Sequence, residues 1–306
     1  MSNINYSIII PHKNVPQLLQ RCLNSIPIRD DVQVIVIDDN SDAEKVDFNN
    51  FPKWNGRNYE YHLTKEGKGA GYARNIGIKQ AIGKWLLFAD ADDFFETEAL
   101  SLLLDKSKDN YDVICWPSDI TLTDGSTASY PYAQRVGYQL FDDSIIGQHS
   151  LSTSKDSSIL FPLFEPWHKM CTRDLIEKYK IRYSEVLSCN DALFSVKLAQ
   201  RAKNVAVYSD IIYHYIKRPS SLSIVITQDR IEQRMKELFR IQHILVEVGK
   251  DNFVCKDIDD HFKLLSKKSF IATMKECFLQ MYIVSIKTGY RSFKRHVLPI
   301  IKNEQR

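Results

Sequence analysis

The sequence predicts an α/β fold, with a mainly parallel sheet flanked by helices and a helical extension at the C-terminus. Short apolar runs over residues 6–10, 32–37 and 84–89 have the length and the β-branched or aromatic content of buried strands. Segments with helical spacing separate these runs, which is the pattern of βα units. From about residue 228 helical spacing predominates, and this predicts two to four further helices.

The N-terminal half alternates between predicted strands and helices. A helix is expected over residues 15–25, a weaker strand over 59–63 and a helix over 72–82. The helix at 97–106 and the strand at 111–116 complete the series. Such a series predicts right-handed crossovers between parallel strands.

Residues 117–160 are polar and irregular. We expect loops there that lie over a crevice at the carboxyl ends of the predicted strands. Periodic signals return after this stretch. Strand-like and helical signals occur at 166–170, helices are expected over 173–179 and 192–200, and strands over 205–208 and 211–215.

Composition and length describe an ordinary globular protein. The chain has 306 residues, 44% of them hydrophobic, which is enough for one large or two modest domains. Six cysteines show no CxxC spacing, which disfavours a zinc knuckle and suits a reducing cytoplasm. The first residues lack the pattern of a signal peptide, and the longest apolar stretch, 278–286, is far shorter than a membrane span. We therefore expect a cytoplasmic protein.

Basic character is concentrated at the C-terminus. The formal net charge is +3, whereas residues 261–306 contain ten Lys and Arg against Glu276 and Glu304, a local charge of +8. Aromatic and aliphatic residues alternate with these cations. The segment is therefore expected either to rest on an anionic membrane surface or to present a solvated helical face whose other side packs on the rest of the protein. No nucleic-acid partner is expected.

Three carboxylates follow the strand at 84–89 directly, in the stretch Asp90-Ala91-Asp92-Asp93. Carboxylates gathered at the carboxyl end of a buried strand favour a counter-charge, most simply a hard divalent cation. Asp38 and Asp39 end another strand in the same way. The alternative is an acidic N-cap and first turn for the helix at 97–106.

A glycine-rich stretch, Gly67 to Gly71, precedes the helix at 72–82. Lys68 and free backbone N–H groups there could hold a phosphate, although neither the GxxxxGK[ST] nor the GxGxxG spacing is present. A flexible turn is the alternative. Arg74, one turn into the helix, is the better candidate for contact with an anionic ligand.

Taken in order, these segments resemble the inverting family-2 glycosyltransferases of bacterial type, whose catalytic domain has the Rossmann-like GT-A fold. The resemblance covers about residues 4–225. It rests first on four stretches, which are Ser7 to Pro11, Val36 to Ser41, Gly71 to Gly77 and Phe88 to Asp93. Three later stretches look like the acceptor half of such enzymes, namely Trp167 to Lys169, Asn190 to Phe194 and Tyr213 to Tyr215.

The resemblance implies a catalytic domain over residues 1–226, with a donor half over 1–116 and an acceptor half over 117–226. Helical spacing and charge, rather than the resemblance, predict the basic helical region over 227–306. Residues expected at the nucleotide are Pro11, Asp38, Asp39, Lys68, Arg74, Asp90 and Ala91. Asp39 would accept from the N–H of a uracil ring, with Asp38 as the reserve candidate. Asp90 would lie near the ribose, and Asp92 would bind a Mn²⁺ or Mg²⁺ ion that bridges the diphosphate.

The same resemblance implies that Asp191 is the general base, although an acid at the start of a helix is commonly only a helix-terminal charge. Asn190 stands where the family usually has glutamate, which puts acceptor choice in doubt. Trp167 is expected at the acceptor or sugar site or in the core, and Lys169 and Asn190 at that same site. His214 is a further metal candidate, with a packed histidine as the alternative.

The sequence thus predicts a metal-dependent inverting hexosyltransferase that moves a sugar from a nucleotide-sugar, with UDP-sugar favoured, to a hydroxyl of a saccharide or lipid-linked saccharide. The product would be a polysaccharide or glycan. One alternative is a sugar-nucleotide nucleotidyltransferase, although the loop after the first strand lacks the glycines expected of one. The other is a non-catalytic metal- or nucleotide-binding module.

Overall fold

The computed structural model describes residues 3–107, 110–122, 127–128, 150–154, 157–217, 227–250, 258, 260–263, 269–284 and 286–297. An eight-stranded sheet lies at its centre, with the strand order β3-β2-β1-β4-β10-β6-β11-β9. The strands are β1 (Tyr6–His12), β2 (Val32–Asp38), β3 (Asn58–Leu63), β4 (Trp85–Phe88), β6 (Val113–Cys115), β9 (Leu151–Ser154), β10 (Lys169–Thr172) and β11 (Val205–Tyr208).

Most of this sheet is parallel. Strands β3, β2, β1 and β4 pair in parallel, as do β6 and β11. Strand β10 is inserted antiparallel between β4 and β6, and β9 is antiparallel at the edge. A smaller sheet contains β5 (Phe94–Phe95), β12 (Tyr213–Lys217), β7 (Ser118–Leu122) and β8 (Thr127–Ala128) in that order. The predicted α/β fold with a mainly parallel sheet is confirmed.

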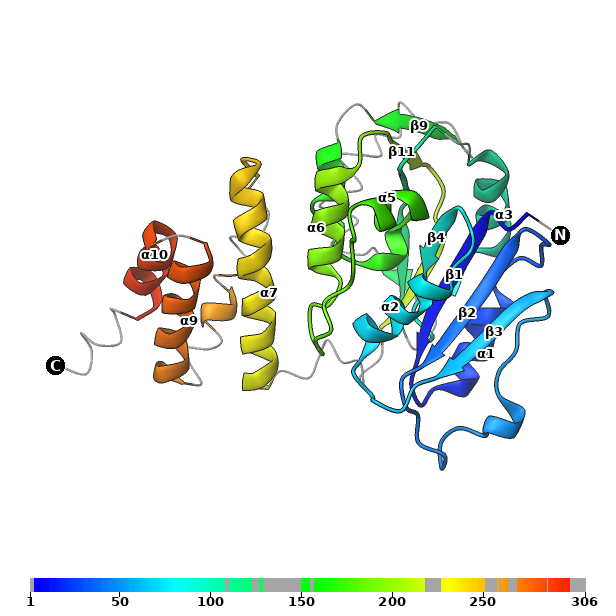
Figure 1. Ribbon diagram of the computed structural model, residues 1–306, viewed down its shortest axis with the longest axis horizontal. Helices are drawn as coiled ribbons and strands as arrows, with labels where there is room; N and C mark the ends of the chain where they lie inside the picture. The colour runs from blue at the N-terminus through cyan, green and yellow to red at the C-terminus, as the bar shows by residue number, and fades with distance from the viewer. Residues whose placement is uncertain are drawn as a thin grey trace.

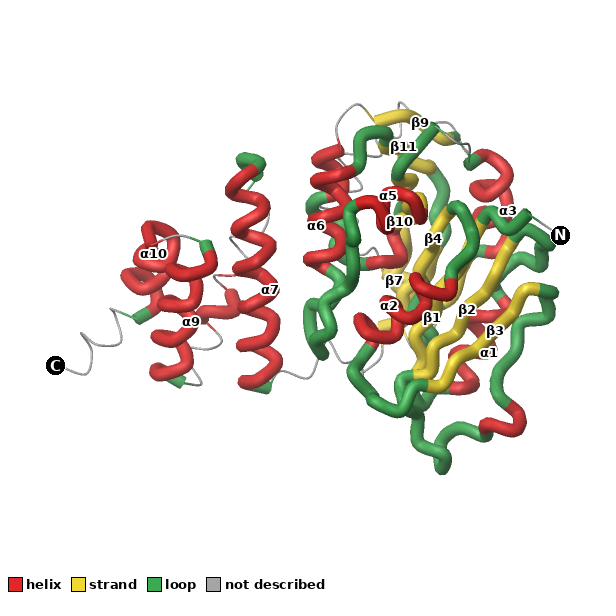
Figure 2. The backbone as a smooth tube through the Cα atoms, viewed as in Figure 1, coloured by secondary structure: helices red, strands yellow, loops and turns green. Residues whose placement is uncertain are grey.

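Helices flank both faces of the large sheet (Figures 1 and 2). They are α1 (Pro16–Asn24), α2 (Ala70–Gln80), α3 (Thr97–Lys106), α5 (Arg173–Lys178) and α6 (Ala192–Arg201), with short 3-10 turns η1 (Phe48–Asn50), η2 (Ser157–Leu160) and η3 (Pro166–His168). Successive side chains of a strand point to opposite faces. Ile8 and Ile10 of β1 therefore pack in one cluster with α1 and α3, whereas Ile9 packs in the other with α2, α5 and α6.

The expected C-terminal extension consists of α7 (Gln228–Glu247), α9 (Phe270–Ile283) and α10 (Ile286–His296) in the described residues. Thr227 caps α7 by accepting from the Arg230 N–H at 3.4 Å. Apolar residues of α7 and α9 belong to the same buried cluster as those of α6. Helix α7 therefore packs on the α/β part rather than standing apart from it (Figure 1).

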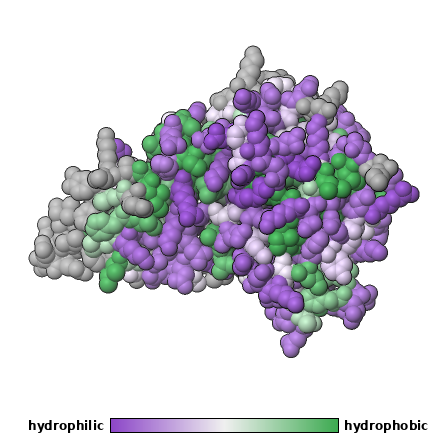
Figure 3. All heavy atoms as spheres, viewed as in Figure 1, coloured by the Kyte–Doolittle hydropathy of each residue, from purple (hydrophilic) through white to green (hydrophobic). Residues whose placement is uncertain are grey.

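The described helices include none that is long and apolar enough to cross a membrane. Most of the surface of the described residues is hydrophilic on the face drawn in Figure 3, and hydrophobic residues form separate patches there.

Candidate functional site

The carboxyl ends of β1, β2 and β4 lie side by side. In the parallel pairing His12 stands opposite Asp38, and Ile9 stands opposite Phe88. Pro11 near the end of β1, the aspartates that end β2 and the acidic stretch after β4 are therefore brought to one edge of the sheet. Crevices outside the carboxyl ends of strands are where ligands bind in open α/β sheets.

Asp38 and Asp39 are both buried but have different partners. The Asp38 carboxylate lies 2.7 Å from His12 Nδ1 and accepts from the Ser41 hydroxyl at 2.6 Å and the Ser41 N–H at 2.8 Å. Burial alone would raise the pKa of Asp38, yet these hydrogen bonds lower it below its usual range. Both oxygens of Asp38 are thus occupied in holding the loop after β2.

Asp39, in contrast, keeps one carboxylate oxygen unused. Its Oδ2 accepts from the Gly69 N–H at 2.9 Å and lies 3.5 Å from Lys13 Nζ. Its Oδ1 is buried and has no hydrogen-bond partner within the described part of the chain. A buried carboxylate oxygen without a donor is costly unless a ligand supplies one.

The glycine-rich stretch folds back over Asp39. Gly67 and Gly69 have φ values of 62° and 94°, which is backbone that glycine adopts at low cost. The Gly69 N–H bond to Asp39 depends on this conformation. Lys68 lies over the Tyr72 ring at 4.7 Å, so its ammonium stays at the rim of the stretch.

The turn Asp90 to Asp93 is tied to β12 by Tyr213. The Tyr213 hydroxyl accepts from the Asp90 N–H at 2.8 Å and donates to Asp93 Oδ2 at 3.0 Å, while the Ile216 N–H donates to Asp93 Oδ1 at 2.7 Å. Burial, together with neighbouring Asp92 and Asp90, raises the pKa of Asp93 well above its usual range. Ala91 is buried in the core.

This turn corrects the helix-cap alternative. The N-cap of α3 is Glu96, which makes no capping hydrogen bond with its side chain among the described residues. Asp93 instead holds the large and small sheets together through Tyr213 and Ile216. Both oxygens of the Asp93 carboxylate therefore accept hydrogen bonds in this structural role.

The donor set can be tested for a divalent cation. Asp90 and Asp92 offer carboxylate oxygens at one strand end, and Mg²⁺ is typically held by one or two carboxylates together with substrate phosphates and water. Within the described ranges, no group of three or more His, Cys, Asp or Glu side chains could hold a metal alone. The set therefore fits a cation shared with a diphosphate and does not form an all-protein cage.

His214 has other neighbours. Its ring stacks on Phe94 with centroids 4.7 Å apart, and its Nε2 lies 3.4 Å from Glu96 Oε2. These contacts favour the alternative that His214 is a packed histidine rather than a metal ligand.

Arg74 joins the two halves of the site. Its Nη2 donates to Asp90 Oδ1, and its Nη1 donates to Asn190 Oδ1 at 2.9 Å. The guanidinium also lies over the Tyr183 ring at 5.2 Å, and Arg74 is only 4% exposed. A planar fork of N–H donors suits this bridging geometry, which lysine could not reproduce.

Asp191 follows Asn190 at the N-cap of α6, and its side chain makes no capping hydrogen bond within the described residues. The carboxylate is therefore not committed to the helix. Burial raises the pKa of Asp191, while nearby Arg74 pulls it back. A carboxylate with a raised pKa is better suited to accept a proton than an ordinary surface aspartate.

Two residues expected at the acceptor are placed elsewhere. Trp167 is 2% exposed and stacks on Tyr213 and Tyr215 at 5.1 and 5.8 Å, so its role is corrected to that of a core tryptophan. Lys169 is also 2% exposed, and its ammonium donates to the carbonyls of Leu163 and Glu165 at 2.6 and 2.7 Å. Burial lowers the pKa of Lys169 to about 8, and its donors hold the turn before β10.

Sequence reasoning gave no individual role to three residues that shape the site, although Tyr213 belongs to a stretch that carries the resemblance. Tyr213 positions the acidic turn, and Lys13 lies beside Asp39. Arg21 of α1 donates to the Asp92 carbonyl and lies 5.4 Å from the Phe94 ring centroid. Lys13 follows Pro11 at the same strand end, so the sequence contained a signal for it. Arg21 carried none, because a lone arginine in a helix usually faces solvent.

The chain matches a family model and several named proteins. Residues 7–161, about half of the chain, match the model described as glycosyl transferase family 2. The chain is 29% identical over 219 residues to a poly(ribitol-phosphate) beta-glucosyltransferase of Bacillus spizizenii, which covers 69% of this chain but 32% of the relative. The matched part of this chain spans about a third of that protein and 62% of the poly(ribitol-phosphate) beta-N-acetylglucosaminyltransferase TarP of Staphylococcus aureus.

A relative of similar length is the GalNAc(5)-diNAcBac-PP-undecaprenol beta-1,3-glucosyltransferase of Campylobacter jejuni. It is 26% identical over 308 residues, covering 97% of this chain and 94% of the relative. The crystal structure of S. aureus TarS residues 1–349 in complex with UDP-GlcNAc superposes with a TM-score of 0.68 at 20% identity, over 92% of this chain and 82% of that one. The fold is therefore shared with TarS, and the chain itself belongs to glycosyl transferase family 2.

Proposed function

We propose that this chain is a metal-dependent, inverting glycosyltransferase that moves a sugar from a nucleotide-sugar to a hydroxyl acceptor in polysaccharide or glycan synthesis. The observation that carries the proposal is the Arg74 bridge, because it joins Asp90 of the acidic turn to the residue beside Asp191. The family membership and the glycosyltransferase names of the relatives support it. UDP-sugar is the favoured donor, and a UDP-GlcNAc complex is known for TarS.

In this proposal the nucleobase binds beside Pro11 and Asp39. The unpartnered Oδ1 of Asp39 would accept from the ring N–H of uracil, which supplies the donor that the buried oxygen lacks. Asp38 supports the loop and does not contact the base, since Ser41 and His12 already occupy its oxygens. Lys68 and Lys13 at the rim would offer positive charge to the diphosphate.

The ribose and diphosphate would lie over the acidic turn. Asp90 and the backbone at Ala91 would contact the ribose, while Asp92 and Asp90 would hold the Mn²⁺ or Mg²⁺ ion, with His214 retained only as a lesser candidate. When bound, this cation stabilises the charge that develops on the leaving diphosphate. Arg74 would keep Asp90 in place during that change.

Asp191 would act as the general base. A carboxylate about 2.6 to 3.2 Å from the acceptor hydroxyl can take its proton as that oxygen attacks the anomeric carbon. The new C–O bond forms on the face opposite the breaking bond to the diphosphate, so the configuration inverts and the nucleoside diphosphate leaves. Burial raises the pKa of Asp191, which assists the proton transfer, and the nearby Arg74 guanidinium acts in the opposite direction by favouring the ionised carboxylate.

We assign residues 1–226 to the catalytic part and 227–306 to a helical region, for which we propose contact with an anionic membrane surface. The relative from C. jejuni is named for an undecaprenol-linked acceptor, which favours a saccharide or lipid-linked saccharide here. Lys275, Arg291 and Arg295 are exposed cations on α9 and α10 that such a surface would attract.

A thermal-shift panel tests the donor site. UDP, GDP, CMP and their sugars are added with and without Mn²⁺ to the unsubstituted protein and to Asp39→Asn and Asp92→Asn variants. We expect UDP to raise the melting temperature most, Asp39→Asn to reduce the shift with or without Mn²⁺, and Asp92→Asn to remove only the Mn²⁺-dependent part. The control is Asp30→Asn, because Asp30 is exposed and lies before β2, at the opposite end of that strand. If no nucleotide stabilises the unsubstituted protein more than the Asp39→Asn variant, the donor assignment fails.

A further inference from the structure

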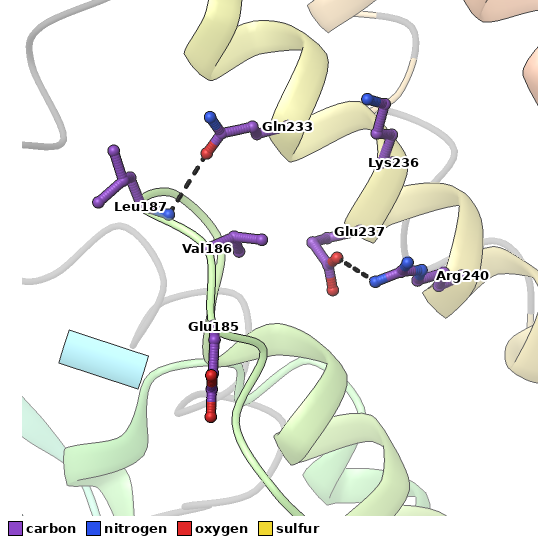
Figure 4. A pocket seen from close by; sticks show the side chains of 7 residues that line it. All are labelled: Glu185, Val186, Leu187, Gln233, Lys236, Glu237 and Arg240. Carbon is purple, nitrogen blue, oxygen red and sulfur yellow. Dashed lines mark hydrogen bonds and ion pairs between the residues drawn. The ribbon is translucent and has the colours of Figure 1, made fainter. Parts of the chain in front are cut away.

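A pocket of about 360 Å³ lies between the segment 184–190 and helix α7 (Figure 4). One wall is formed by residues of the segment, and the other by residues of α7. The lining residues are Glu185, Val186, Leu187, Gln233, Lys236, Glu237 and Arg240. None of them was among the residues predicted for the site.

The segment 184–190 belongs to the catalytic site on its other side. The Ser184 N–H donates to the Asn190 carbonyl at 3.0 Å, which brings the two ends of the segment together next to Asp191. A Cβ on Gly71 would lie 2.1 Å from the Ser184 carbonyl oxygen and 3.0 Å from Asn190 Cβ. The segment is therefore pressed against the start of α2, and the pocket begins a few residues from the proposed base.

The α7 wall is anchored to this segment. Glu237 is 1% exposed, and its carboxylate accepts from the Ser184 hydroxyl and from Arg240, both at 2.6 Å. The Leu187 N–H donates to Gln233 Oε1 at 3.3 Å (Figure 4). These bonds fix the separation of the two walls, so the pocket is preformed.

The remaining polar groups of the pocket suit a polyhydroxylated ligand. Lys236 is exposed and has no hydrogen bond or ion pair within the described ranges. The Gln233 Nε2 group donates to no partner among the described residues, whereas the Glu185 carboxylate points away from α7 and accepts from Asn75 at 3.2 Å (Figure 4). Val186 adds an apolar surface. Ammonium and amide groups can pair with several hydroxyls, whereas the lining contains no aromatic ring on which a second nucleobase could stack.

We propose that this pocket binds a saccharide unit of the acceptor, with Lys236 and Gln233 as its recognition residues. The inference rests on the proposed transferase function and names where the acceptor lies. Trp167 and Lys169 are each 2% exposed and offer little surface to a sugar, so the proposed site lies at other residues. Acceptor choice is then determined partly by α7, which lies outside the segment 7–161 that matches the family model.

Saturation-transfer NMR on the full chain tests the pocket. The probes are the methyl β-glycosides of glucose, galactose, N-acetylglucosamine and N-acetylgalactosamine, each measured with UDP and Mn²⁺ present. We expect saturation transfer to at least one glycoside, reduced five-fold or more by Lys236→Ala and by Gln233→Glu, which removes the amide donors but keeps an oxygen that can accept from the Leu187 N–H. Lys275→Ala is the matched control, because Lys275 is an exposed lysine on α9 that does not line the pocket.

Saturation transfer that survives both pocket substitutions overturns the proposal, and so does the absence of transfer to every glycoside. Circular dichroism and the UDP-induced thermal shift of each variant check that the fold and donor site persist. Loss of the UDP shift in the unsubstituted protein would instead contradict the proposed function itself. The two failures are therefore distinguishable.

Discussion

Glu237 provides a strong test of whether α7 contributes to catalysis. This residue of α7 is buried, and its carboxylate accepts from the Ser184 hydroxyl and from Arg240. Ser184 in turn begins the segment whose other end carries Asn190 and Asp191. Replacing Glu237 by Ala therefore removes the main polar link between the C-terminal helices and the proposed base.

The expected loss of unfolding free energy follows from the two hydrogen-bond partners of Glu237, Ser184 and Arg240. A hydrogen bond to a charged group contributes about 1.5–3 kcal/mol, which applies to the Ser184 contact. The Arg240 side chain is 55% exposed, so its ion pair adds at most about 1 kcal/mol. Glu237→Ala should thus lower the free energy of unfolding by about 2–3 kcal/mol. Glu237→Gln can still accept from Ser184 and should cost about 1 kcal/mol or less.

Catalysis should respond differently from donor binding. A loosened segment 184–191 misplaces Asp191, and a misplacement that costs about 1.4 kcal/mol in the barrier lowers kcat about ten-fold. The UDP-induced thermal shift should stay unchanged, and Glu237→Gln should restore most of kcat. Urea unfolding and the rate of UDP release from the UDP-sugar measure the two effects.

The matched control is Glu247→Ala, near the end of the same helix. Glu247 pairs with His243 at 3.5 Å, and both side chains are more than half exposed at 57% and 51%. Its loss should change the unfolding free energy by less than about 0.5 kcal/mol. If Glu237→Ala matches Glu247→Ala in both stability and kcat, α7 does not position the base.

Three further outcomes are expected. Asp191→Asn should keep UDP binding and abolish transfer, and retained turnover in this variant would exclude Asp191 as the base. Because burial raises the pKa of Asp191, the unsubstituted enzyme should lose activity on acidification at a pH above 3.8, the ordinary pKa of an aspartate. Burial raises the pKa of Glu276 to about 7 from 4.5, so the folded state holds its proton more tightly and stability should fall as pH rises between those values. Glu276→Gln should flatten that slope and stabilise the protein at pH 8 by on the order of 1 kcal/mol in urea unfolding; an unchanged slope would contradict the reasoning. Charge reversal at Lys275, Arg291 and Arg295 should abolish co-sedimentation with vesicles of anionic lipid, and equal sedimentation would remove the membrane proposal.

The α/β series was predictable because strand length and burial leave a clear pattern in the sequence. Runs such as 32–37 are apolar throughout, as expected for strands covered on both faces, and β2 lies at Val32–Asp38. The antiparallel insertion of β10 was not predictable, because pairing direction depends on contacts between strands distant in sequence. Met170 pairs with Leu87 on one side and with Ile114 on the other.

The preference for Asp39 over Asp38 came from the family resemblance, because residue type and spacing alone do not separate them. Asp38 ends β2, Asp39 follows it directly, and both are buried. Which carboxylate keeps an unpartnered oxygen depends on Ser41 and His12 turning toward Asp38 and on Gly69 reaching Asp39. These are tertiary contacts that residue type and spacing do not encode.

The acceptor residues were misplaced for a related reason. Tryptophan and lysine suit a sugar site by their chemistry, yet the chemistry of a side chain does not reveal its burial. Lys169 lies on a strand in the interior of the sheet, and the turn at 163–165 supplies carbonyls that its ammonium can reach. The burial of Glu237 could not be predicted for the opposite reason. In the sequence its i,i+3 pair with Arg240 on a helix resembles an ordinary surface pair.

The asparagine at position 190 changes the electrostatics that act on the base. Arg74 is buried and already pairs with Asp90, and its second nitrogen donates to the neutral Asn190 amide. A glutamate at this position would place a second carboxylate on the same guanidinium and a like charge beside Asp191, which would raise the pKa of the base further. With Asn190, the positive charge of Arg74 is shared by Asp90 and Asp191 alone. The departure from the family pattern therefore leaves Asp191 easier to ionise, and it leaves contact with the acceptor to other residues, among which the α7 pocket is our proposed site.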